Sequence, residues 1–248
     1  MQGAATVEQG LRLRIAAVRE EIAAACAAVG RSPDTVELVA VTKTVPADVV
    51  RAALAAGLAT FGENRVQEAD AKIPQVGGGA WHLIGHLQRN KARTAVQRFD
   101  CIQSVDSPRL ARRLDAVRET RPVDVLAQVN LTGATTQEGV ALADLGRLCE
   151  VIDRETGLTL RGLMTIGPLG GDLAALCACF RELREARDAL RPKLPNQPLT
   201  ELSMGMTDDF GAAIAEGSTM IRVGRAIFGS RPTAASAVPA PPPMDSPC

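Results

Sequence analysis

A regular alternation of short β-like runs with longer helical patterns constrains the fold of this chain more than any other feature. The segments between the β-like runs carry apolar residues at intervals of three and four. Eight strands, each followed by a helix, are typical of a closed (β/α)₈ barrel of the TIM type, which usually needs about 250 residues. This chain has 248 residues. The expected strands lie near residues 36–43, 59–62, 81–84, 101–104, 123–130, 158–165, 199–203 and 219–223.

An open, doubly wound sheet is the alternative, because periodicity does not show whether a sheet closes. No Gly-rich dinucleotide motif follows the first strand, which weakens that alternative. An additional N-terminal helix is expected from an apolar stripe formed by Val7, Leu11, Ile15, Val18, Ile22, Cys26 and Val29. The sequence therefore predicts one α/β barrel domain over residues 1–231. A Pro-rich tail over 232–248 is expected to be disordered.

Bulk composition argues against several classes of partner. The chain carries 28 acidic and 28 basic residues, so its net charge predicts neither a nucleic acid nor an anionic membrane as a partner. It has no leader-like start and no run of about 18 apolar residues, which indicates a cytoplasmic protein. The six cysteines show no paired metal-ligand spacing, and no metal site is expected. A monomer is the expected oligomeric state, since no unusual apolar repeat occurs.

Lys43 ends the first apolar run in a chain that uses arginine for most of its positive charge. Only four of the 28 basic residues are lysine. Burial lowers the pKa of an amine from about 10.4, and a neutral amine is a nucleophile that can form a Schiff base with an aldehyde. Arginine cannot do this. The alternative interpretation is a strand-end lysine whose stem packs while its ammonium group reaches water.

The last two predicted strands lead into turns suited to a phosphate group. In barrels of this type, the loops after strands seven and eight often bind phosphate through free backbone amides. Thr207 or Asp208 is a candidate N-cap after strand seven. On strand eight Arg222 shares a face with Gly224 and is expected to point into the barrel. The predicted phosphate site is formed by Ser203, Thr207, Gly224 and Arg225, although each could also be an ordinary turn residue.

Six segments follow one another along almost the whole chain: Ala40–Pro46, Phe61–Glu68, Trp81–Lys91, Leu160–Met164, Leu202–Asp209 and Gly217–Gly224. In this order they resemble the small pyridoxal phosphate (PLP) homeostasis protein family and, more distantly, the N-terminal barrel domain of alanine racemase. The resemblance implies that Lys43 forms a Schiff base with PLP. It also implies that Ser203, Thr207, Gly224 and Arg225 surround the phosphate and that Arg222 lies near the pyridine nitrogen.

Some further residues are candidates on weaker grounds. Asn64 follows the second strand and could approach the cofactor ring, although a helix N-cap role would also explain it. Lys91 could be a second amine at the rim, although an exposed structural lysine is the simpler interpretation. His82 and His86 have no neighbouring carboxylates in the sequence and are expected to serve packing or hydrogen bonding.

Arg222 and the absence of tyrosine bear on what the cofactor could do. Arginine stays protonated and cannot accept a proton from the pyridine ring, so PLP beside Arg222 would be a weak electron sink. In alanine racemase a tyrosine is the base opposite the lysine, and this chain has no tyrosine. The resemblance therefore implies a cytosolic PLP carrier without robust turnover, with PLP-dependent apoenzymes as possible partners. A racemase of low activity and a Schiff-base aldolase for a phosphorylated sugar remain as alternatives.

Overall fold

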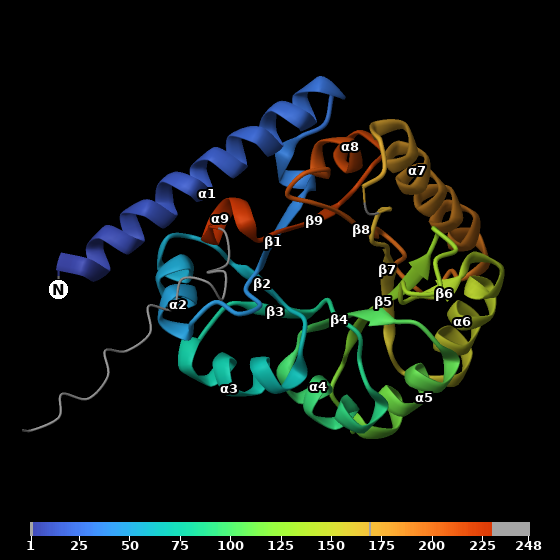
Figure 1. Cartoon of the computed structure of the whole chain (residues 1–248). Helices are drawn as coiled ribbons and strands as arrows, with labels where there is room; N and C mark the ends of the chain where they lie inside the picture. The colour runs from blue at the N-terminus through green and yellow to red at the C-terminus, as the bar shows by residue number, and fades with distance from the viewer. Residues whose placement is uncertain (1, 169, 230–248) are drawn as a thin grey trace, which may run out of the picture.

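A computed structural model of the chain describes residues 2–168 and 170–229. Eight parallel strands form a closed barrel, and helices surround it (Figure 1). The barrel strands are β1 (Glu37–Val41), β2 (Thr60–Glu63), β3 (Ala80–Leu83), β4 (Cys101–Val105), β5 (Asp124–Asn130), β7 (Thr159–Met164), β8 (Glu201–Met206) and β9 (Met220–Val223). Each coincides with a β-like run of the sequence, with ends that differ by a few residues.

Two strand pairings close the barrel. β1 pairs with β9 and places Ala40 opposite Val223, which joins the first strand to the last. β4 pairs with β5 and places Cys101 opposite Asp124, which completes the ring. The open, doubly wound alternative is therefore wrong, and the (β/α)₈ barrel prediction is confirmed. All strand carboxyl ends meet at one mouth of the barrel, as parallel pairing requires.

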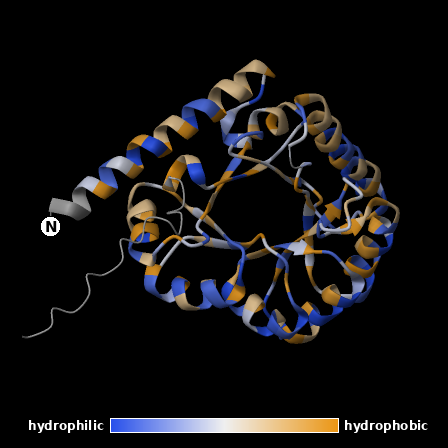
Figure 2. Cartoon of the chain, in the orientation of Figure 1, coloured by the Kyte–Doolittle hydropathy of each residue, from blue (hydrophilic) through white to orange (hydrophobic). Residues whose placement is uncertain are grey.

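The surrounding helices are amphipathic and pack on the outer face of the strands. Figure 2 shows that they carry both hydrophilic and hydrophobic residues. Ile221 and Val223 of β9 belong to the large outer core, whereas Met220 joins an inner cluster with Val39 and Leu126. The helices are α2 (Ala47–Ala55), α3 (Val66–Val76), α4 (Ala92–Arg98), α5 (Pro108–Val117), α6 (Leu142–Glu155), α7 (Leu173–Leu190), α8 (Phe210–Ala215) and α9 (Arg225–Phe228), with 3₁₀ turns η1 (Pro33–Thr35), η2 (Arg89–Lys91) and η3 (Arg191–Lys193).

The predicted N-terminal helix is α1 (Gln2–Ala28), which packs against α2, α8 and α9 on one side of the barrel (Figure 1). The central part of the predicted apolar stripe is buried, from Leu11 to Cys26. Its two end members are not, since Val7 is 45% and Val29 41% exposed. The stripe therefore extends beyond the surface that the barrel covers.

Three local features differ from the sequence expectations or lie outside the described residues. A two-residue strand, β6 (Val140–Ala141), pairs with the end of β5 and was too short to be predicted. The N-cap of α8 is Asp209, so the expectation of Thr207 or Asp208 is wrong; β8 continues to Met206 and shifts the turn. The Pro-rich segment 232–248 and the domain boundary at residue 231 lie outside the described residues.

None of the helices in the described ranges combines the length and the apolar character needed to span a membrane.

Candidate functional site

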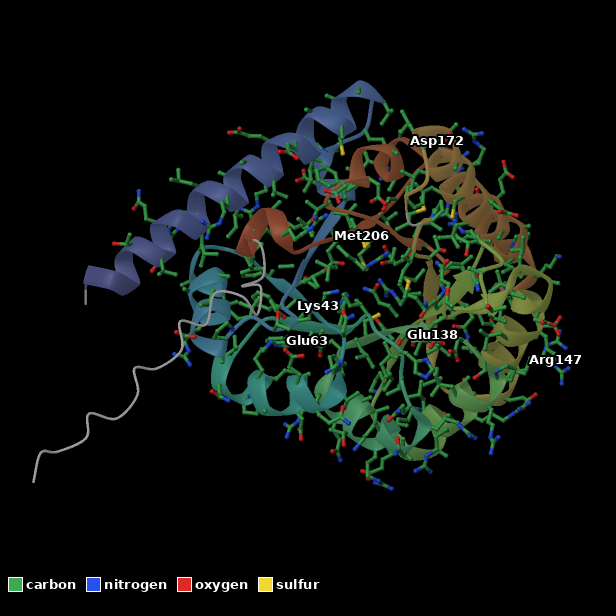
Figure 3. The ribbon with its side chains drawn as sticks, in the orientation of Figure 1. Lys43, Glu63, Glu138, Arg147, Asp172 and Met206 are labelled. Atoms are coloured by element: carbon green, nitrogen blue, oxygen red, sulfur yellow. The ribbon has the colours of Figure 1, made fainter. Side chains whose placement is uncertain are left out.

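Lys43 lies in a tight turn directly after β1, at the mouth of the barrel (Figure 3). The carbonyl oxygen of Thr42 accepts a hydrogen bond from the N–H of Val45 at 2.9 Å, which closes a β-turn with Lys43 at its second position. Thr44, at the third position, has a φ of +67°, and Lys43 has no positive φ. This is the pattern of a type II turn, whose third position normally holds glycine. A β-branched residue with positive φ is strained by about 1–3 kcal/mol.

Two side chains of α3 hold the peptide groups on either side of Lys43. Glu68 accepts a hydrogen bond from the N–H of Thr44 at 2.5 Å. Lys72, one helical turn later, donates from Nζ to the carbonyl oxygen of Thr42 at 2.7 Å. Glu68 and Lys72 also approach each other, with Nζ and Oε1 3.6 Å apart. The strained turn that carries Lys43 is therefore bonded to α3 both before and after the lysine.

Glu63, at the end of β2, completes this arrangement. Its Oε1 accepts hydrogen bonds from Lys72 Nζ at 2.5 Å and from Thr42 Oγ1 at 2.7 Å. Glu63 is fully buried, and burial raises the pKa of its carboxyl above the ordinary value. Its other oxygen, Oε2, has no hydrogen-bond partner among the described residues.

Two adjacent turns bring together most of the predicted phosphate site. The guanidinium of Arg225, after β9, donates to the carboxylate of Asp208, after β8, so the two turns are neighbours. The backbone N–H groups of Thr207, Asp208, Gly224 and Arg225 donate to no acceptor within the described ranges. A Cβ on Gly224 would lie 3.2 Å from the carbonyl oxygen of Val41, so this turn also lies close to the end of β1. Thr207 and Gly224 are half-buried.

Arg222 points into the barrel and forms the centre of a buried polar network. Its guanidinium donates to Ser203 Oγ at 2.7 Å and to the carbonyl oxygen of Thr165 at 2.8 Å. Ser203 in turn donates to Gln103 at 2.6 Å, and the Gln103 amide lies 2.8 Å from His82 Nδ1. No carboxylate in the described ranges forms an ion pair with Arg222, and burial lowers its pKa to about 10. The guanidinium therefore stays protonated at neutral pH. Ser203, within β8, is fully buried.

Asn64 directly follows β2. It lines a cavity of about 520 Å³ at the mouth, together with Arg65, His86 and Lys91. Asn64 and Lys91 are therefore the two sequence candidates that line this cavity, whereas Lys43, Arg222 and the residues of the predicted phosphate site do not. The N-cap of α3 is Arg65, so the N-cap interpretation of Asn64 is wrong.

The two histidines occupy different surroundings. His82 is 7% exposed and belongs to the buried network, whereas His86 is at the rim. His86 Nδ1 lies 3.6 Å from Asp106 and 3.3 Å from Glu138, so carboxylates that are distant in the sequence do neighbour it. These three groups are mostly exposed, and we assign no metal to them.

Sequence reasoning missed the residues that hold the Lys43 turn. Glu68 and Lys72 stand four residues apart on a helix, and Lys72 is one of only four lysines in the chain. The small number of lysines could have pointed to Lys72, because a lysine in a chain that mostly uses arginine is expected to make a specific contact. The partner groups on the backbone of Thr42 and Thr44 could not be inferred, because they depend on how β1 and α3 meet.

Comparison with known proteins places this geometry in a family. A model of the alanine racemase N-terminal domain matches residues 13–232. The pyridoxal phosphate homeostasis protein of Escherichia coli K12 is 41% identical over 224 residues, covering 88% of this chain and 95% of that protein. The protein of the same name from Pseudomonas aeruginosa is 44% identical over 221 residues, covering 88% and 94%.

Solved structures give the same result. PipY of Synechococcus elongatus has been solved without PLP and with PLP bound, and the two structures match this chain with TM-scores of 0.81 and 0.78. PipY is 42% identical in sequence, and each match covers 88% of this chain and 100% of PipY. Alanine racemase of Corynebacterium glutamicum is 16% identical with a TM-score of 0.70, covering 94% of this chain and 63% of that one, and so shares the fold alone.

The closed barrel, with a lysine turn after its first strand, defines a protein of the alanine racemase N-terminal-domain class. Within that class, the chain belongs to the pyridoxal phosphate homeostasis protein family.

Proposed function

We propose that this protein binds PLP at the barrel mouth, holds it reversibly on Lys43 and takes part in PLP homeostasis. The observation that carries the proposal is Arg222, a guanidinium that is 5% exposed and has only neutral hydrogen-bond partners among the described residues. A buried cation without an ion pair is costly unless a ligand uses it. Arg222 lies on the strand that pairs with β1, whose end carries Lys43.

The residues at the mouth fit the chemical groups of PLP. The unpartnered N–H groups of Thr207, Gly224 and Arg225 suit the phosphate, and the missing side chain of Gly224 leaves its backbone open to a ligand. Because the Arg225 side chain is bonded to Asp208, its backbone N–H is the better candidate for this contact. Arg222 would face the pyridine nitrogen, and Ser203 would act by holding Arg222.

Bound PLP would supply an aldehyde, and the amine of Lys43 would be the nucleophile that condenses with it reversibly, with release of one water molecule. Asn64, directly after β2, would lie on the side of the ring that faces the cavity. These assignments rest on the turn of Lys43 and on the neighbouring turns after β8 and β9. The name of the relatives from E. coli and P. aeruginosa and the PLP-bound structure of PipY support PLP as the ligand.

The same residues favour storage over turnover. The protonated guanidinium of Arg222 donates to a ring nitrogen and leaves it unprotonated, which weakens the ring as an electron sink. The chain also has no tyrosine to act as a second base. Deuterium exchange at the α-carbon of a panel of amino acids tests this point: we expect exchange no faster than with free PLP, and rapid exchange would favour a racemase.

Titration with PLP tests the proposed binding. We expect a visible absorption band from the lysine-bound cofactor in the unmodified protein and its loss in Lys43→Ala. Lys193→Ala is the matched control, because Lys193 is an exposed lysine in η3. A band that survives in Lys43→Ala, or that disappears in Lys193→Ala, would refute the role of Lys43.

A further inference from the structure

We propose that Glu68 and Lys72 are positioning residues that hold the type II turn carrying Lys43, and so keep its amine directed at the barrel mouth. The identity of the ligand that the amine binds there rests on the proposed function. The bonds of Glu68 and Lys72 to the turn, which we call the α3 clamp, do not depend on that ligand. The α3 clamp explains why a threonine can occupy a position with a φ of +67°.

Glu68 fixes the orientation of one particular peptide group. Type I and type II turns differ by a flip of the peptide between their second and third residues, which here joins Lys43 to Thr44. The N–H of that peptide belongs to Thr44, and Glu68 accepts it at 2.5 Å. A flip would break this bond and would turn the carbonyl of Lys43 toward the Glu68 carboxylate. The unstrained type I turn is therefore disfavoured by Glu68.

Lys72 holds the peptide on the other side of Lys43. Its ammonium donates to the carbonyl of Thr42, the same oxygen that closes the turn with Val45, and its charge is balanced by the buried Glu63. Lys72 and Glu68 lie on one face of α3 because they are four residues apart. The helix itself is anchored by Ala69, which is fully buried. Both bonds therefore tie the turn to a fixed part of the barrel wall.

Loss of the clamp should lower the fraction of molecules in which Lys43 is correctly placed. Without Glu68, threonine at the third position favours the flipped turn, because its own φ is then negative. Apparent affinity falls in proportion to the competent fraction, so a turn that is competent about a tenth of the time binds about tenfold more weakly. Glycine at position 44 favours the type II turn without any clamp. Thr44→Gly should therefore rescue Glu68→Ala.

The experiment compares PLP with 4-deoxypyridoxine 5′-phosphate, which has the phosphate and ring but no aldehyde. We expect Glu68→Ala to weaken PLP binding by about tenfold and to leave binding of the analogue unchanged. Glu68→Gln, which keeps an acceptor oxygen, and Glu68→Ala combined with Thr44→Gly should bind PLP nearly as the unmodified protein does. The inference would be overturned if Glu68→Ala bound PLP as tightly as the unmodified protein does. It would also be overturned if Glu68→Ala lost affinity for PLP and for the analogue to the same extent.

A second readout needs no cofactor and separates failure of the clamp from failure of the proposed function. Hydrogen exchange of the Thr44 amide, followed by NMR, should be slow in the unmodified protein and in Glu68→Gln, and fast in Glu68→Ala. Equal exchange in all three would overturn the clamp whether or not the protein binds PLP. Slow exchange without PLP binding would support the clamp and refute the proposed function.

Glu216→Gln is the stability control for these variants. Glu216 is 8% exposed and pairs with Arg181 and Arg184 near the amino end of β9, at the opposite end of the barrel from Lys43. We expect it to lower stability without changing PLP affinity or Thr44 exchange. Lys72→Met should weaken PLP binding as Glu68→Ala does, and the Glu68 variants decide the inference if Lys72→Met does not fold.

Discussion

Replacing Lys72 by methionine should destabilise the fold strongly and in a pH-dependent way. Lys72 is 6% exposed and gives two hydrogen bonds, to the fully buried Glu63 at 2.5 Å and to the carbonyl of Thr42 at 2.7 Å. Hydrogen bonds to a charged group contribute about 1.5–3 kcal/mol each. Removing one partner of a buried ion pair costs about 3–5 kcal/mol. Because Glu63 keeps its bond to Thr42 Oγ1, we expect a loss of about 3–4 kcal/mol at neutral pH.

The sign of the pH dependence follows from Glu63. Burial raises the pKa of its carboxyl above the ordinary value of 4.5, whereas Lys72 opposes that rise. Without Lys72 the pKa in the folded state is higher still. A carboxyl with a raised folded pKa stabilises the fold below the unfolded pKa, and this contribution is lost as the pH rises through the folded pKa. The cost of Lys72→Met should therefore be smaller near about pH 5 than near about pH 8.

Urea unfolding followed by the fluorescence of Trp81 measures this cost. Trp81 is the single tryptophan of the chain, is 2% exposed and lies 5.1 Å from the ring of Phe61, centroid to centroid. The double variant Glu63→Gln with Lys72→Met removes both charges and should recover part of the lost stability. An equal loss at both pH values, or a double variant no more stable than Lys72→Met, would refute the reasoning that a stranded carboxylate causes the loss.

Three other predictions concern separate parts of the molecule. Arg222→Glu should shift the absorption maximum of bound PLP, and an unchanged spectrum would remove Arg222 from the site. Gly85→Ala should lower the free energy of unfolding by about 1–3 kcal/mol, measured as a lower urea midpoint, because the added Cβ would lie 2.3 Å from the carbonyl oxygen of Asn64. An unchanged midpoint would contradict that contact. Burial lowers the pKa of His82, so the folded state favours the neutral imidazole, and the stability that this contributes is lost as the pH falls below about 6.5. His82→Gln should therefore make the free energy of unfolding depend less on pH in that range.

The sequence predicted the barrel well because strand and helix patterns are local. The alternation of Met220, Ile221, Arg222 and Val223 correctly assigned one face to the barrel interior and the other to the helices. Errors arose where a boundary depends on a few atoms. Asp209 caps α8 because β8 runs three residues longer than its apolar pattern indicated.

The site was only partly predictable, for a different reason. The sequence placed Thr207, Gly224 and Arg225 together because they follow strand ends, which share one mouth in a parallel barrel, and their two turns are neighbours in the structure. Their role toward a ligand stays a prediction. Glu63 and Lys72 were not recognised, because their buried pairing and their bonds to Thr42 depend on contacts across β1, β2 and α3. The strain at Thr44 is likewise invisible in a sequence, where threonine gives no sign of a positive φ.

Borohydride trapping tests the central claim most directly. The protein is loaded with PLP, reduced with borohydride, digested and analysed by mass spectrometry, which locates every pyridoxyl-modified lysine among the four in the chain. The proposed function predicts a pyridoxyl group on Lys43. Modification of Lys91 or Lys193 with Lys43 left intact, or no modified lysine at all, would contradict it.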